Sequence, residues 1–337
     1  MSHVRILSLD GGGTRGAFYF YFLNLLEKRL KMPVRDMFDY IGGTSIGGIS
    51  SLLLTHPLKW FGYRDDFYIQ EMMDTHLEQT LLKVFFEPPP FWIKSFGIFS
   101  AKYSYQKDVI NAGLKDHLFG SDPFGTNKKA KCLVFAHNAS TNEVKAFKSW
   151  KHTDYYLYTV ARATSAAPTY FAPVCIGDDV FIDGAMASAN NPTAFMLYEA
   201  SLYEPKKKAF VLSLGAGYSN VNFTCDDIGH GSMSEWSTRF VNLMLSASDR
   251  SFEYLSGRHK NYKRSHQMEE SWLENRSAYF GRYQHGSLTT FRIKPNVSSA
   301  IDTLDPKLFE KLKDTAQRVF DEKPDLIDAL EEGLRNY

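Results

Sequence analysis

The chain of 337 residues is long enough to bury one large α/β domain, or two modest ones, without disulfides or structural metals. Its 39 lysine and arginine residues balance 38 aspartate and glutamate residues, which argues against a nucleic-acid partner and against a polybasic membrane anchor. Aromatic residues make up 15% of the chain, and this content is the feature that departs from an ordinary globular composition.

Cysteine usage and the first residues indicate the compartment. Cys132, Cys175 and Cys225 lack the spacing of a zinc site or of a redox pair. The amino-terminal segment carries charges and no apolar h-region, and no apolar run is long enough to span a membrane. We therefore expect a cytoplasmic protein without a metal or cofactor. Any contact with lipid is expected to be peripheral, and export by a route that needs no signal peptide is an alternative that the sequence leaves open.

Short apolar runs alternate with runs of helical periodicity along most of the chain. This alternation predicts an α/β fold with a mainly parallel central sheet and helices on both faces. Ligand chemistry then belongs at the carboxyl ends of the strands, where two glycine-rich segments begin. We expect strands at 4–9, 37–41, 131–137, 144–147, 180–182 and 210–214, and helices at 14–30, 46–54, 155–163, 193–203, 234–255, 306–320 and 325–334.

Residues from about 60 to 105 interrupt this alternation. The run FFEPPPFW at 85–92 combines a proline triplet with aromatic residues. A loop packed on the core and a lid or wall for acyl chains both fit such an insertion. We divide the chain into a catalytic core at 1–217, which includes the insertion, and a mainly helical part at 218–337 packed on the same domain.

The glycine-rich segment at 42–48 predicts a nucleophile. Its Gly-x-Ser-x-Gly pattern runs from Gly43 to Gly47 and places Ser45 between a strand and a helix. Small residues on both sides let the chain turn sharply enough to expose the serine hydroxyl. The following helix points its amino terminus at the reacting centre, which favours developing negative charge. Ser45 is therefore the expected nucleophile.

The glycine-rich segment at 10–16 has two readings. The main-chain N–H groups of Gly11, Gly12 and Gly13 are able to approach a substrate closely and form an oxyanion hole. The same glycines with Gly16 also satisfy a dinucleotide fingerprint, with Asp36 at the expected distance, which would make the protein an oxidoreductase. The Gly-x-Ser-x-Gly elbow at the next strand end favours acyl transfer.

Asp183 is the best candidate for the general base. It ends the strand expected at 180–182, and Gly184 follows it and leaves room for substrate, although a plain Asp-Gly turn is the alternative reading. A histidine base would come from the histidines that follow Asp183, of which the one in Gly-His-Gly fits least badly. A direct Ser-Asp dyad remains as a hypothesis. The histidines in question are His230, His259, His266 and His285.

Several segments together resemble the patatin-like phospholipases, which are bacterial and plant lipid acyl hydrolases. The resemblance covers about residues 5–217 and thins beyond them. It implies a three-layer α/β sandwich related to the α/β-hydrolases, in which Ser45 and Asp183 form a dyad that hydrolyses glycerolipid acyl esters without calcium. The segments are DGGGTRG (10–16), GTSIG (43–47), ARATSAAPTYF (161–171), DGA (183–185), NNP (190–192) and SLGAG (213–217).

The same resemblance carries expectations about partners. It implies membrane phospholipid as substrate, met by peripheral contact only, and it allows a protein or nucleotide activator. Arg15 has two readings. In the functional one it attracts a lipid phosphate or helps shape the glycine loop, and in the structural one it is a helix-start arginine paired with a nearby acid. Gly43, Gly47 and Gly184 support the site through their small size. A non-catalytic interaction protein that keeps the fold is the remaining alternative.

Overall fold

The computed structural model of the chain describes residues 3–56, 68–74, 111, 113–126, 129–168, 170–217, 243–244, 247, 267–272, 278–285, 287–297 and 305–336. The expected insertion at 60–105 lies outside these ranges, apart from 68–74 and the helix α4 (Ile69–Asp74) within it. The expected helix at 234–255 lies outside them except for residues 243, 244 and 247, and His230, His259 and His266 also lie outside them.

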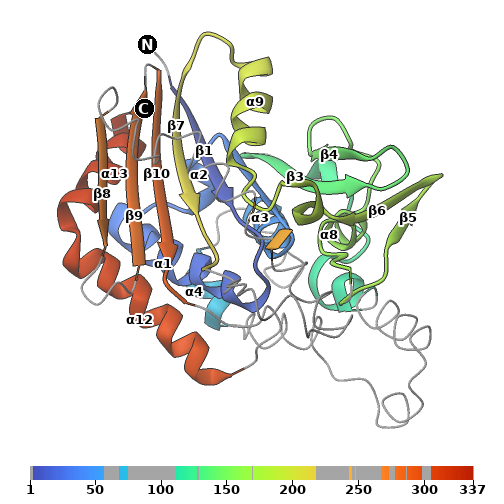
Figure 1. The fold of residues 1–337 in the computed structure, drawn as a ribbon, viewed down its shortest axis with the longest axis horizontal. Coiled ribbons are helices and arrows are strands. Elements are labelled where there is room, and N and C mark those ends of the chain that lie inside the picture. The colour runs from blue at the N-terminus through green and yellow to red at the C-terminus, as the bar shows by residue number, and fades with distance from the viewer. Residues whose placement is uncertain are drawn as a thin grey trace, which may run out of the picture.

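Ten strands form one sheet whose centre is parallel (Figure 1). The five parallel strands follow the order β3 (Lys131–Asn138), β2 (Tyr40–Thr44), β1 (His3–Leu9), β7 (Lys208–Leu214) and β10 (Leu288–Pro295). The antiparallel strands flank this centre: β4 (Glu143–Lys148), β6 (Asp179–Asp183) and β5 (Val174–Ile176) beyond β3, with β9 (Ala278–His285) and β8 (Gln267–Trp272) beyond β10.

Helices cover both faces of the sheet, which gives the expected three-layer sandwich. Leu7 and Leu9 of β1 pack into the core formed with α1, α3, α12 and α13, while Ile6 packs toward α9. No described helix combines the length and the apolar character needed to cross a membrane. The helices are α1 (Ala17–Leu30), α2 (Val34–Met37), α3 (Ile46–Thr55), α8 (Leu157–Thr164), α9 (Thr193–Tyr203), α12 (Pro306–Glu322) and α13 (Pro324–Asn336), with short turns η1 (Gly13–Gly16), η3 (Gly113–Phe119), η4 (Phe124–Thr126) and η5 (Gly184–Ala187).

The structure departs from the sequence expectations at the start of β2 and beyond β7, and it adds the short strand β5. The strand expected at 37–41 is β2 at 40–44, because the chain before it forms the short helix α2 and the strand continues through Gly42 and Gly43. The part of the chain at 218–337, expected to be mainly helical, also contributes strands β8, β9 and β10, which extend the sheet beyond β7. This part therefore completes the sheet as well as covering it.

Strand pairing brings the ends of β2 and β6 together along one edge of β3. Thr44, the last residue of β2, pairs with Phe135, and Asp183, the last residue of β6, pairs with the next residue, Ala136. Strand β4 occupies the other edge of β3 over the same residues. Because β2 and β6 run in opposite directions, both chains leave the sheet at the same point, where Ser45 follows Thr44.

Candidate active site

Ser45 sits in a strained turn between β2 and α3. Its backbone has φ 57° and ψ −127°, a combination that a residue with a β-carbon rarely adopts. Such strain is estimated at about 1–3 kcal/mol and persists only where the surrounding structure enforces it. The residue is partly exposed, while the helix that follows it is almost entirely buried. The turn expected from the Gly-x-Ser-x-Gly pattern is therefore present.

The glycines of this turn are required by close packing. A β-carbon on Gly43 would lie 2.2 Å from the carbonyl carbon of Gly47, and one on Gly47 would lie 2.2 Å from the Leu9 carbonyl oxygen. Real side chains do not approach main-chain atoms so closely. The turn therefore fits against the end of β1 only without side chains, and this brings Ser45 beside the first glycine segment.

Thr164 holds the turn at Ser45 through its side-chain hydroxyl. Its Oγ1 accepts a hydrogen bond from the Ser45 main-chain N–H at 2.8 Å and donates to the Phe135 carbonyl at 2.5 Å. The hydroxyl is buried and makes both bonds at once. One side chain at the end of α8 thus ties Ser45 to β3.

Replacing Thr164 by valine is expected to lower the free energy of unfolding by about 1–3 kcal/mol, because two main-chain groups lose their partner in the interior. Urea unfolding measures this change. Thr164→Ser keeps the hydroxyl and is the matched control, expected to be clearly more stable than the valine variant. Equal stability of the two variants would mean that the hydroxyl does not hold the turn.

Asp183 is buried at the end of β6, next to Ser45. Burial raises the pKa of its carboxyl group from 3.8 to about 6, while the Ala185 N–H, which donates to Oδ1 at 2.9 Å, and the Ser45 hydroxyl lower it. The other oxygen, Oδ2, accepts no hydrogen bond within 3.5 Å from any described group. A carboxylate with one oxygen anchored and one open therefore stands beside the serine.

Gly184 lets the end of β6, with the Asp183 carboxylate, pack closely against β3 and the end of β2. A β-carbon on Gly184 would lie 2.7 Å from the Phe135 carbonyl oxygen and 3.0 Å from Cγ2 of Thr44. The main-chain N–H of Asp183 donates to the Ala166 carbonyl at 3.0 Å, which fixes the strand end from its other side. The sequence predicts a small residue after Asp183 at this strand end, and the close contacts of Gly184 explain why a side chain does not fit there.

The first glycine segment lies directly against Ser45. A β-carbon on Gly11 would come within 3.1 Å of the Ser45 β-carbon. The Gly11 N–H, however, donates to the Asn190 carbonyl at 2.9 Å, so it already has an acceptor in the protein. The N–H groups of Gly12 and Gly13 have none among the described residues. Of the three expected donors, the N–H groups of Gly12 and Gly13 are therefore the ones without an acceptor in the described part of the chain.

Arg15 contacts the glycine loop itself. Its Nε donates to the Gly12 carbonyl at 3.2 Å, and the side chain is 3% exposed. Burial lowers the pKa of the guanidinium to about 10, so it stays charged at neutral pH. Of the two readings of Arg15, this contact supports the one in which it shapes the loop.

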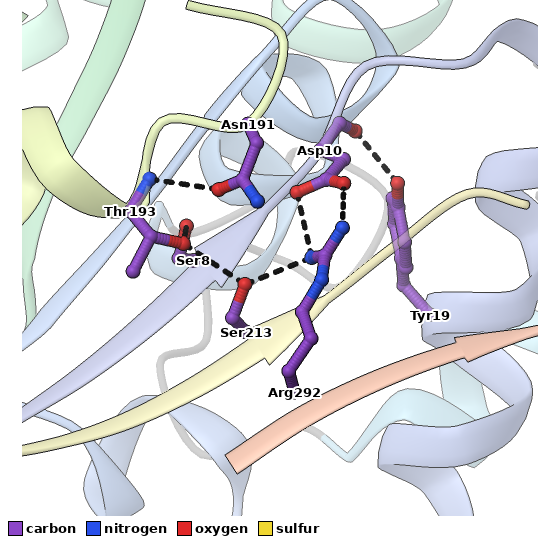
Figure 2. Close-up of polar contacts among 7 residues, drawn as sticks. All are labelled: Ser8, Asp10, Tyr19, Asn191, Thr193, Ser213 and Arg292. Atoms are coloured by element: carbon purple, nitrogen blue, oxygen red, sulfur yellow. Dashed lines mark hydrogen bonds and ion pairs between the residues drawn. The ribbon is translucent and has the colours of Figure 1, made fainter. Parts of the chain in front are cut away.

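The sequence interpretation missed a buried polar cluster behind the loop (Figure 2). Asp10 received no role there, yet both of its carboxylate oxygens bind Arg292 of β10. Alternation of polar and apolar residues over 290–294 is the signal in the sequence for a strand with a polar face. No pattern indicated the partner, which lies 282 residues away.

The geometry also bears on the alternatives. Asp36, needed for a dinucleotide site, lies in α2 before β2, away from the carboxyl strand ends, and pairs with Lys129 at 2.9 Å. His285 pairs with Leu288 at the start of β10, opposite the amino end of β7. Asp36 and His285 therefore lie at the amino ends of the parallel strands, whereas Ser45 follows the carboxyl end of β2. From there Asp36 cannot bind a dinucleotide at the glycine loop, and His285 cannot serve as the base for Ser45.

Comparison with known proteins points to one family. A family model described as Patatin-like phospholipase matches residues 7–197, more than half of the chain. A Pseudomonas aeruginosa protein named cGAMP-activated phospholipase is 31% identical over 269 residues, covering 74% of this chain and 73% of the relative. Calcium-independent phospholipase A2-gamma of Rattus norvegicus is 26% identical over 258 residues, covering 73% of this chain.

The chain spans about a third of the rat protein, 32% of its length. Among solved structures, human GIVD cytosolic phospholipase A2 aligns with a TM-score of 0.51 at 9% identity, covering 100% of this chain and 63% of that one, which bears on the fold alone. The expected family, the three-layer fold and the family model agree. The chain belongs to the patatin-like phospholipase family.

Proposed function

We propose that the protein is a lipid acyl hydrolase of the phospholipase A type, which cleaves acyl esters of glycerophospholipids through Ser45 and Asp183. The observation that carries this proposal is the meeting of β2 and β6 on one edge of β3, which sets a strained serine beside a buried carboxylate. Names of relatives, calcium-independent phospholipase A2 and cGAMP-activated phospholipase, support the substrate class.

In the proposed mechanism, Ser45 Oγ attacks the acyl carbonyl carbon while Asp183 Oδ2 takes the hydroxyl proton. The carbonyl oxygen becomes negative and accepts hydrogen bonds from the N–H groups of Gly12 and Gly13. The ester C–O bond then breaks, and the lysophospholipid oxygen leaves with the proton from Asp183. Water then attacks the acyl-serine while the same carboxylate takes its proton; the bond to Ser45 Oγ breaks, this oxygen takes the proton back from Asp183, and the fatty acid leaves.

The raised pKa of Asp183 suits this role. A carboxylate with an ordinary pKa is too weak a base for a serine hydroxyl, and proton transfer is most effective when the pKa of the base lies near the working pH. Burial supplies the increase to about 6. In the proposed dyad the carboxylate acts without a mediating histidine, so it must be ionised and must contact the serine directly.

The hydrolysis rate is expected to rise tenfold for each unit of pH below about 6 and to level off above it, because only ionised Asp183 accepts the proton. Initial rates with a neutral ester between pH 4.5 and 8.5 measure this dependence, with circular dichroism at each pH to show that the fold persists. A rate that is independent of pH across this range would contradict the assignment of Asp183 as base.

The proposal is tested by incubating the purified protein with vesicles of mixed phospholipids and identifying the released fatty acids and lysolipids by mass spectrometry. Parallel samples contain a calcium chelator, cGAMP or cell extract, since the names of relatives suggest calcium independence and a nucleotide activator. Release in the presence of chelator supports the proposal, and no release in any sample contradicts it. Release only with cGAMP or extract identifies the activator class.

A further inference from the structure

Asp10, which directly precedes the glycine loop, is held on every side (Figure 2). Its carboxylate oxygens accept hydrogen bonds from Arg292 Nη1 at 3.0 Å and Nη2 at 2.5 Å. Its carbonyl oxygen accepts one from the Tyr19 hydroxyl at 2.6 Å, and its N–H donates to the Leu214 carbonyl at 3.1 Å. The residue is 3% exposed. The start of the loop is therefore fixed through both side chain and main chain.

Arg292 is itself fixed within the sheet. It is 1% exposed, and its Nη1 also donates to Ser213 Oγ of β7 at 2.8 Å. Ser213 continues through Thr193 to Ser8 of β1, with 2.9 Å between successive hydroxyl oxygens. Gly215 leaves the room that the guanidinium needs, since a β-carbon there would lie 2.9 Å from Nη2. Two parallel strands and α9 thus set the direction of the guanidinium.

Stability alone is a weak reason for this arrangement. Removing two charges from water costs several kcal/mol per ion, and apolar residues of similar volume often stabilise a core equally well. What a bidentate arginine–carboxylate pair adds is a defined direction, because two parallel N–H···O bonds fix the relative orientation of both groups. The residues between 11 and 13 have no side chains with which to fix their own orientation.

We propose that Arg292 is a positioning residue for the oxyanion loop: through Asp10 it sets the direction in which the N–H groups of Gly12 and Gly13 point. This inference rests on the hydrolase function proposed above. The family model matches residues 7–197. The proposal therefore gives a role in the site to strand β10, which lies outside the matched residues. Arg15 holds the loop from its other end through the Gly12 carbonyl.

The proposed role affects the transition state more than substrate binding. Donors of an oxyanion hole act on the oxygen only when it becomes negative, and they must lie about 2.7–3.1 Å from it. A displacement of about 1 Å in such a group lowers turnover by about a hundredfold. Loss of the Asp10–Arg292 pair is therefore expected to lower kcat with little change in KM.

The test is a double-mutant cycle of Asp10→Asn, Arg292→Gln and the double variant, assayed with the same phospholipid vesicles. Each single variant is expected to lose about a hundredfold in kcat, and the double variant no more than either, because the pair acts as one unit. Arg292→Lys keeps the charge without the bidentate geometry and should remain impaired. Retention of kcat within about twofold by the double variant would overturn the proposal.

A matched control separates positioning from general stability. Lys148 of β4 pairs with Glu199 of α9 at 2.7 Å, and both side chains are largely buried, at 14% and 11% exposure. Lys148→Met breaks an ion pair away from Ser45 and is expected to lower the melting temperature while leaving kcat unchanged. If it lowers kcat as much as Arg292→Gln does, the loss reflects stability and the positioning role is wrong.

A second measurement does not depend on hydrolysis. Amide hydrogen exchange, followed by mass spectrometry on peptides covering residues 10–16, is expected to accelerate in the double variant and to stay unchanged in Lys148→Met. Unchanged exchange in the double variant overturns the inference whether or not the enzyme is active. If exchange accelerates in the double variant but the wild-type protein hydrolyses no ester, the hydrolase proposal is contradicted. The role of Arg292 in holding the loop then still stands.

Discussion

Replacing Ser45 by alanine is expected to lower kcat for phospholipid hydrolysis by roughly 10⁵-fold or more, because the attacking oxygen is lost and no other group replaces it. The substitution removes one oxygen of a partly exposed residue, and the turn is held through the Ser45 main-chain N–H, which alanine keeps, so the variant should fold normally. Fatty-acid release from vesicles measures the rate. Labelling by a fluorophosphonate, read from the intact mass, shows whether the nucleophile is gone.

Ser45→Gly provides the matched control for folding. Glycine adopts the observed φ of 57° without strain, whereas alanine keeps the β-carbon that makes this conformation unfavourable. We expect both variants to be inactive and the glycine variant to have the higher melting temperature. Near-normal hydrolysis by Ser45→Ala, or labelling that persists at another serine, would exclude Ser45 as the nucleophile.

Replacing Asp183 by asparagine is expected to lower kcat by roughly 10³-fold or more, since the amide cannot accept the serine proton. The amide oxygen can still accept the hydrogen bond from the Ala185 N–H, so the local structure should persist. The same vesicle assay at pH 7.5 measures the loss. Near-normal turnover would place the base elsewhere and end the dyad hypothesis.

Asp183→Asn is expected to stabilise the fold at neutral pH although it lowers kcat. The pKa of Asp183 is raised in the folded protein, so the folded state binds this proton more tightly than the unfolded state does. Ionisation of Asp183 therefore destabilises the fold progressively as pH rises from about 4 to about 6. We expect Asp183→Asn to melt above the wild type at pH 7.5, with a difference that shrinks toward pH 4. Equal melting temperatures at pH 7.5 would contradict the raised pKa.

Local patterns predicted the elements that form the centre of the sheet. The apolar runs that became β1, β3 and β7 are buried on both faces, and such strands need no more than a continuous apolar run. The pattern failed at β2, because glycine is a poor strand former. Gly42 is there for packing, since a β-carbon would lie 2.7 Å from the Leu133 carbonyl oxygen.

The candidate site was predictable in part, for a physical reason. The sharp turn at Ser45 depends on its immediate neighbours, so a short motif contains the information for it. The placement of Asp183 beside Ser45 depends on the register of two strands against β3, so the residues alone give the dyad only as a hypothesis, which the family resemblance also implies. The Gly11 N–H donates a hydrogen bond to the carbonyl of Asn190, which is distant in the sequence, and no local pattern encodes such a contact.

The dependence of the oxyanion loop on β10 has a consequence for biosynthesis. Chains emerge from the ribosome amino terminus first, and the glycine loop is synthesised long before its anchor, 282 residues later. Strand β1 likewise needs β7, some 200 residues downstream, to complete the sheet beside it. We expect a nascent chain to carry Ser45 without the anchored glycine loop until Arg292 has been synthesised and β10 has paired with β7. In the proposed hydrolase, the site would therefore be completed only after the chain has passed β10.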